Sequence, residues 1–205
     1  MGTSTSSAGP GSGSPLVPPW ADPTPNVPLP QPDPQRFRAF RTALGKFVGG
    51  GERRQLHTAL RHYARHSTGG AATGPRRYGS MAGAGGRLVS LLSDLRGGGT
   101  GEASVGIDLS RLKGAPIDYA IQEIARAIAP SNGDRERIIN GLQAALSRAL
   151  EGSETFDPAA LSEDILVDVL LNYLTEVVFE QVILDSGQAF EKAPDAELNA
   201  HREKE

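Results

Sequence analysis

The chain of 205 residues contains no cysteine. Disulfides, thiolate nucleophiles and cysteine-ligated zinc or iron–sulfur sites are therefore excluded. The sequence also lacks an apolar run long enough to span a membrane, and its N-terminus lacks the basic and apolar segments of a secretory signal. No GxxxxGK[ST] loop, GxGxxG fingerprint or GxSxG elbow occurs. We therefore expect neither an enzyme nor a bound cofactor.

Prolines are rare after residue 34 and concentrated before it. Residues 1–34 hold ten of the 15 prolines, after a tip rich in Gly, Ser and Thr. Proline removes backbone donors and biases its neighbours towards extended backbone. Residues 1–34 are thus predicted to be a disordered leader, with a flexible tip on a stiff spacer. It contains the only tryptophan, Trp20, which we expect to anchor it on a partner or on the protein's own body.

Helical periodicity dominates residues 35–187 and predicts an all-α, multi-helix bundle. Helices are expected over 35–48 and 52–66, between Pro116 and Pro130, and from Ser131 to Leu150. A last helix, over residues 157–184, is apolar nearly all round, which predicts a long, central and buried helix. Residues 188–205 form a polar tail.

Glycine interrupts the apolar seam of residues 75–96 at positions 79, 83, 85 and 86. Each glycine inside a helix costs about 1 kcal/mol relative to alanine. Either the regular helix begins near Gly86, or the glycines let another part of the chain approach closely. We favour close packing.

Charge is divided between a basic part, residues 35–96, and an acidic part, residues 107–187. Residues 34–96 hold 12 Lys and Arg against two acids, whereas residues 97–205 hold nine against 20. This division suggests two different partners, or attraction between the two parts. Arginines could also contact nucleic-acid phosphates, although no known nucleic-acid-binding motif is present and this alternative is not favoured. The candidates are Arg53, Arg54, Arg61, Arg65, Arg76 and Arg77.

Histidines at four-residue spacing, His62 and His66, have the separation that can place two imidazoles on one metal. No glutamate lies between them, and their neighbours Arg61 and Arg65 would oppose a divalent cation. We expect no metal site.

The N-terminal tip, MGTSTS, offers a different chemistry. It matches the M-G-x-x-x-[ST] pattern of N-myristoylation. More generally, removal of Met1 leaves the α-amine of Gly2, and an ordinary α-amine has a pKa of about 7.7–8.0. An appreciable fraction is then unprotonated and nucleophilic. Small residues beside Gly2 would let this tip enter a narrow active site.

Three segments of the chain resemble the QatB family, the small non-enzymatic component of bacterial Qat anti-phage systems. They are the leader GTSTSSAGPGSGSPLVPPW, the segment RRYGSMAGAGG and the helix NYLTEVVFEQVI, and the resemblance extends to about Gly187. It implies a bacterial cytoplasmic protein with three companions: an ATPase, a QueC-like enzyme and a TatD-like DNase. QueC-like enzymes activate a 7-deazaguanine carboxylate with ATP and pass it to an amine.

The reactive tip and the resemblance together suggest that the QueC-like enzyme binds the leader and joins a deazapurine to the Gly2 amine. The leader residues expected to contact that partner are Thr3, Ser4, Thr5, Ser6, Gly9, Pro10, Gly11, Pro18, Pro19 and Trp20. The alternatives are a nucleic-acid-binding adaptor for the DNase and a structural scaffold for the ATPase. Myristoylation would require a eukaryotic host enzyme and a membrane, and we expect no membrane partner.

Overall fold

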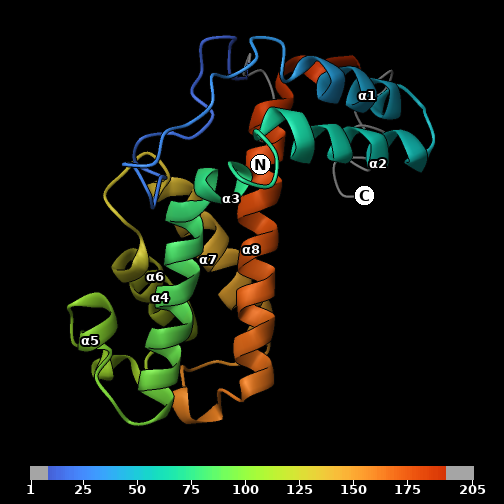
Figure 1. The fold of residues 1–205 in the computed structure, drawn as a ribbon. Helices are drawn as coiled ribbons and strands as arrows, with labels where there is room; N and C mark the ends of the chain where they lie inside the picture. Colours follow the sequence, from blue (N-terminus) through green and yellow to red (C-terminus); the bar gives the residue numbers. More distant parts are fainter. Residues whose placement is uncertain (1–8, 193–205) are drawn as a thin grey trace. The chain divides into compact units, whose positions relative to one another are not determined.

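The computed structural model describes residues 9–192 and confirms the predicted all-α fold with a long C-terminal helix (Figure 1). No strand forms within this range. The α-helices are α1 (Arg38–Val48), α2 (Arg53–His62), α3 (Gly74–Arg77), α4 (Gly79–Arg96), α5 (Glu102–Val105), α6 (Ile117–Ile128), α7 (Arg135–Ala149) and α8 (Glu163–Ser186). A π-helical turn, Tyr63–Ser67, follows α2, and 3-10 turns form at Ser110–Leu112, Pro158–Ala160 and Gly187–Lys192.

The chain forms two compact units. Unit 1 comprises residues 9–78 and 180–192 of the described chain, and unit 2 comprises residues 79–179. Each of the two units contributes a stretch of α8.

Unit 1 is built around an aromatic core between α1 and α2. Phe40, Phe47 and Val48 are almost fully buried there, because they recur on one face of α1. Ala189 and Phe190 belong to the same core. The predicted polar tail therefore begins inside a packed core, and its remainder, residues 193–205, lies outside the described residues.

Unit 2 confirms that glycine in α4 serves close packing. The helix begins at Gly79 and not near Gly86. A Cβ at Gly85 would lie 3.1 Å from Leu170 Cδ1 and 3.2 Å from Tyr173 Cε1, whereas one at Gly86 would meet nothing within 4 Å. Figure 1 shows α4 beside the first part of α8. Of these two glycines, only Gly85 is therefore in close contact with neighbouring side chains.

The long helix α8 differs from its prediction at its start. We expected Asp157 and Pro158 to open it, but they open a 3-10 turn, in which Asp157 Oδ1 accepts a hydrogen bond from Ala159 N at 3.1 Å. The helix itself starts at Glu163.

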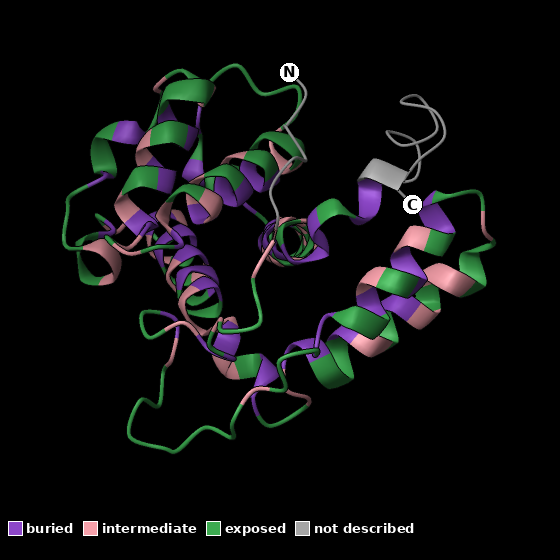
Figure 2. Ribbon diagram, turned by 90° about the horizontal axis from the view of Figure 1, so that it is seen from above, coloured by how far each residue is buried: buried purple, intermediate pink, exposed green. Residues whose placement is uncertain are grey.

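Burial of α8 is also less complete than predicted. Val167, Leu171 and Val178 are 55 %, 58 % and 40 % exposed, so the expectation of a helix buried all round is wrong for one face. Figure 2 shows buried and exposed residues side by side on the helices. Apolar composition alone did not show which face of α8 would be covered.

Candidate functional site

The leader has no helix between Gly9 and Pro34, as its prolines predict, yet part of it is packed within unit 1. Leu16, Val17 and Ala21 are 4 %, 3 % and 2 % exposed. The sequence predicted a disordered spacer up to residue 34, and the structure differs because these three small or aliphatic side chains are buried.

Arginine side chains hold the backbone of the leader. Arg36 Nη2 donates to the carbonyl oxygen of Ser14 at 2.7 Å, and Arg41 Nη2 donates to that of Pro10 at 3.1 Å. Arg77 Nη1 donates to the carbonyl oxygen of Leu16 at 3.0 Å. Proline-rich backbone has fewer N–H donors than carbonyl acceptors, and a guanidinium offers five donors and no acceptor. The leader and the arginines therefore have complementary hydrogen-bonding needs.

A fourth arginine, Arg76, binds the second half of the leader. Its Nε and Nη2 atoms donate to the two carboxylate oxygens of Asp22 at 3.0 and 2.7 Å. Nη2 also donates to the carbonyl oxygens of Thr24 and Val27. The hydrogen bonds from Arg76 lower the pKa of Asp22 below its ordinary value, and the same pair raises the pKa of Arg76. We call Arg36, Arg41, Arg76 and Arg77 the arginine clamp.

A buried aspartate, Asp185, joins two arginines of the clamp. Asp185, 2 % exposed, accepts hydrogen bonds from Arg77 Nη2 at 2.9 and 3.0 Å. Tyr63 Oη and Gln181 Nε2 donate to the same carboxylate at 2.8 and 2.9 Å. Arg41 Nε donates to the Asp185 backbone carbonyl at 2.9 Å. Because a buried charge is costly unless it is paired and hydrogen-bonded, this network makes burial of the clamp feasible.

Burial changes the pKa values of Tyr63 and Arg36. It raises the pKa of Tyr63, with a further contribution from the negative charge of Asp185. It also lowers the pKa of Arg36, whose Nε and Nη1 atoms have no hydrogen-bond partner among the described residues. The guanidinium carbons of Arg36 and Arg41 lie 4.7 and 5.0 Å from the centroid of the Phe37 ring. Cation–π attraction thus offsets part of the missing hydrogen bonding.

The predicted leader residues fall into two groups. Gly2, Thr3, Ser4, Thr5 and Ser6 lie outside the described residues. Gly9 has a φ of +67°, in the left-handed region that favours glycine, and a Cβ there would lie 2.9 Å from the backbone Cα of Gly187. Pro10 is held through its carbonyl, whereas Gly11 and Pro19 are exposed and Pro18 is half-buried.

Trp20 is 51 % exposed and does not anchor the leader on the described protein. That part of the expectation is wrong: Leu16 and Val17 fill the buried positions instead. The exposed tryptophan remains available to a partner.

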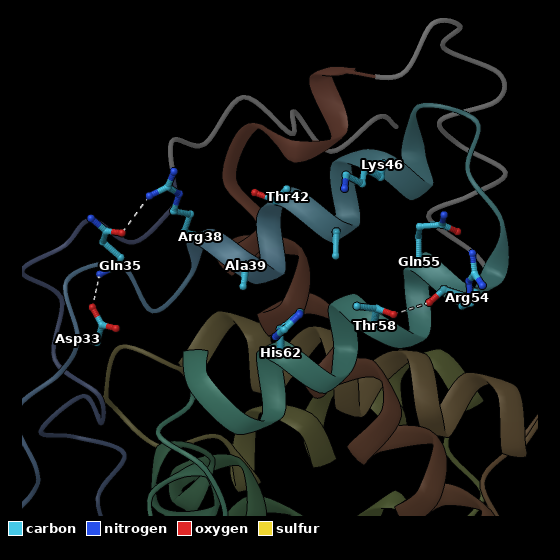
Figure 3. Close-up of a pocket in the computed structure, with 11 residues that line it drawn as sticks. Asp33, Gln35, Arg38, Ala39, Thr42, Lys46, Arg54, Gln55, Thr58 and His62 are labelled. Atoms are coloured by element: carbon cyan, nitrogen blue, oxygen red, sulfur yellow. Dashed lines mark hydrogen bonds between the residues drawn. The ribbon is translucent and has the colours of Figure 1, made fainter.

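The candidate nucleic-acid arginines do not form one surface. Arg76 and Arg77 belong to the clamp, whereas Arg53, Arg54, Arg61 and Arg65 are exposed on α2 and the turn after it. Arg54 borders an open groove of about 620 Å³ between α1 and α2, together with Arg38, Lys46 and His62 (Figure 3).

A family model described as "Qat anti-phage system associated protein QatB" matches residues 69–205. The chain belongs to the QatB family. It is therefore a component of an anti-phage defence system. No curated protein and no solved structure matches the chain.

The QatB match starts at Gly69, after the leader and the first two helices. It contains Arg76, Arg77 and Asp185, whereas Arg36 and Arg41 precede it. It also runs on to Glu205, beyond the end near Gly187 that the resemblance suggested. The leader of this QatB-family chain thus lies outside the matched region but is bonded to residues within it.

Sequence reasoning missed the roles of Arg36, Arg41, Tyr63 and Asp185. Two signals were present: a proline run with surplus carbonyl acceptors, and a basic segment almost without acids to pair with. Neither signal specifies which arginine meets which carbonyl, because such contacts follow no sequence period.

Within residues 9–192 of this QatB-family chain, no group of three His, Cys, Asp or Glu side chains has the arrangement to hold a metal ion. The rings of His62 and His66 lie 5.8 Å apart, between centroids. No helix in the same range has the length and apolar character required to cross a bilayer.

Proposed function

We propose that the chain is a non-catalytic component of a bacterial cytoplasmic Qat complex that presents its N-terminus as a substrate. In this proposal the QueC-like partner binds the leader and attaches a 7-deazapurine to the Gly2 amine. The ATPase and the TatD-like DNase of the same system are the other partners. The observation that carries the proposal is the arginine clamp, which fixes the leader through its backbone from Pro10 to Val27.

The clamp limits how far the N-terminus can extend. Arg41 holds the Pro10 carbonyl, which lies eight residues from Gly2. Eight fully extended residues span at most about 29 Å. A partner that grips the described protein near Pro10 would therefore find the Gly2 amine within a restricted distance. Such tethering raises the local concentration of the amine at the partner's active site.

The chemistry needs only an unprotonated primary amine from this chain. The partner would activate the deazapurine carboxylate with ATP as an acyl adenylate, releasing pyrophosphate. The Gly2 nitrogen would then attack the carbonyl carbon, AMP would leave with the bonding electron pair, and a base would take the amine proton. An amide bond results. Gly2 has no side chain, and its neighbours Thr3 to Ser6 are small, so the tip suits a narrow channel.

The exposed Trp20 supports a binding role for the leader. Tryptophan is enriched among the residues that dominate protein interfaces. Here it is half exposed on a segment whose neighbours Val17 and Ala21 are buried, so its backbone is held in place. Binding of its ring by the partner would then cost little additional ordering.

Mass spectrometry of the chain co-expressed with its QueC-like partner tests the proposal. Gly2→Pro should abolish the adduct, because proline offers a secondary amine constrained by its ring. Gly2→Ala is the matched control: it keeps a primary α-amine and should still be modified. Equal modification of the Pro and Ala variants would contradict a reaction at the Gly2 amine.

A further inference from the structure

We propose that the groove between α1 and α2 binds the phosphate backbone of single-stranded nucleic acid. This inference does not depend on the modification of Gly2. It rests on the side chains that line the groove, on their unneutralised charge and on the absence of an apolar anchor among them.

The groove has two facing rows of polar side chains. Arg38, Thr42 and Lys46 line it from α1, each four residues from the next, and α2 contributes a second row at the same spacing (Figure 3). Residues four apart share a helix face. The second row consists of Arg54, Thr58 and His62. Each row therefore offers a basic residue at either end and a hydroxyl group between them.

Within the described residues of unit 1, little neutralises these cations. Arg38 donates to an uncharged partner, the side-chain oxygen of Gln35, at 3.2 Å. Arg54 lies 4.0 Å from Glu52, but both side chains are at least 80 % exposed, and such pairs contribute little. Lys46 forms no ion pair within residues 9–192. Asp33 is the one acid among the described residues that line the groove, and it accepts a hydrogen bond from the Gln35 backbone.

The described residues of unit 1 carry a net positive charge, as the groove does. The described residues of unit 1 carry 11 Lys and Arg against six Asp and Glu, whereas unit 2 carries eight against 14. A polyanion would be attracted to unit 1 and repelled by unit 2.

The lining residues favour a nucleic acid over an acidic protein. Protein interfaces depend on a few buried aromatic or aliphatic anchors. Among the described residues that line this groove, Ala39 and Ala43 are the only apolar ones. Binding to a phosphate backbone is instead supplied mainly by Lys and Arg, and needs no apolar anchor.

The extent of the basic surface favours a strand over a free nucleotide. Arg61 and Arg65 are exposed on α2 and the turn after it, beyond the groove itself. Basic grooves that follow a single-stranded backbone commonly cover about 4–16 nucleotides.

The groove also contains an acceptor, the buried side-chain oxygen of Gln55, that has no donor among the described residues. Among the described residues that line the groove, His62 is the one aromatic side chain, so stacking contributes little and binding should depend strongly on salt.

Fluorescence anisotropy with the full chain and a labelled single strand of about 16 nucleotides tests the inference. The groove variant, Arg38→Gln/Lys46→Gln/Arg54→Gln, removes three cations. The matched control, Arg111→Gln/Lys113→Gln/Arg126→Gln, removes two arginines and one lysine that are exposed in unit 2. The two variants have the same net charge.

Three lost phosphate contacts should flatten the slope of log affinity against log salt by about 2. Between about 50 and about 200 mM salt, that slope corresponds to a roughly twentyfold change in affinity. The wild type and the control should retain the steep dependence, and the groove variant should lose it. Circular dichroism checks that each variant is folded.

Several outcomes would overturn the inference. They are no binding by the wild type at low salt, equal weakening by the two variants, and tighter binding of AMP or inorganic phosphate than of the strand. Groove-dependent binding of a poly-glutamate peptide of matched charge, as tight as that of the strand, would point to an acidic protein instead.

Discussion

Replacing the carboxylate of Asp185 tests whether the buried network holds the clamp together. Asp185→Ala removes the acceptor for Arg77, Tyr63 and Gln181 and leaves the Arg77 guanidinium, 7 % exposed, without its counter-charge. Removing one partner of a buried ion pair costs about 3–5 kcal/mol. With a slope of about 2 kcal/mol per molar urea, the unfolding midpoint should fall by about 2 M.

Trp20 makes this prediction measurable. It is the only tryptophan, and it lies in the leader of unit 1, so its fluorescence during urea unfolding reports on that unit. Glu52→Ala is the matched control, because this carboxylate is 80 % exposed in a loose pair with Arg54 and should change stability by less than about 1 kcal/mol. The double variant Arg77→Met/Asp185→Leu should recover part of the loss, since Arg77 is then no longer left as a buried charge without its partner. Equal midpoints for Asp185→Ala and Glu52→Ala would refute the reasoning.

Three further predictions concern other parts of the chain. Gly86→Ala should stabilise α4 by up to about 1 kcal/mol. Gly85→Ala should give no such stabilisation, because its Cβ would lie 3.1 Å from a neighbouring side chain. Thermal unfolding measures the stability of the two variants. The pKa of Asp22 is lowered by Arg76, so this pair stabilises the folded state above the ordinary pKa of Asp and ceases to do so as pH falls through the lowered value. Trp20 fluorescence should therefore show an acid transition that Asp22→Asn lacks; superimposable profiles would contradict this. Deleting residues 2–8 keeps the clamp and leaves Gly9 after Met1. The shortened N-terminus should no longer reach the partner's active site, so modification and defence in a phage plaque assay should both be lost. If the chain is only a scaffold, the same deletion should leave defence intact.

Much of the helical fold was predictable because it follows local periodicity. In α6, isoleucines recur at helical steps between Pro116 and Pro130, and the observed helix, Ile117–Ile128, fits between these two prolines. The start of α8 was misplaced because Asp157 and Pro158 suit a 3-10 turn as well as an α-helix. Local sequence chemistry did not distinguish the two.

The clamp was not predictable, for a different physical reason. Its contacts join residues far apart in sequence, such as Arg77 with Leu16 and with Asp185. Hydrophobic periodicity shows which face of an element is buried, but it does not show which backbone carbonyl a guanidinium will reach. The aliphatic pair Leu16 and Val17 was the available sign of packing in the leader, because these side chains are buried whereas the larger Trp20 is half exposed.

The division of charge along the sequence predicted only some of the ion pairs in the structure. One buried pair, Arg77 with Asp185, does join the basic and acidic parts of the sequence. On α8, however, Glu176 pairs with Arg148, an arginine of the acidic part, at 3.0 Å. That pair lies within unit 2, so the negative charge of Glu176 is compensated there. In the α1–α2 groove, Arg38 and Lys46 form no ion pair within residues 9–192.

Presentation of Gly2 as a substrate is the central claim, and the mass of the N-terminal peptide tests it most directly. The chain would be purified from cells that contain an active QueC-like partner and compared with chain made without it. The account predicts a gain equal to the mass of the deazapurine carboxylic acid less one water, located by fragmentation on Gly2. An unmodified Gly2 in the presence of the active partner would contradict it.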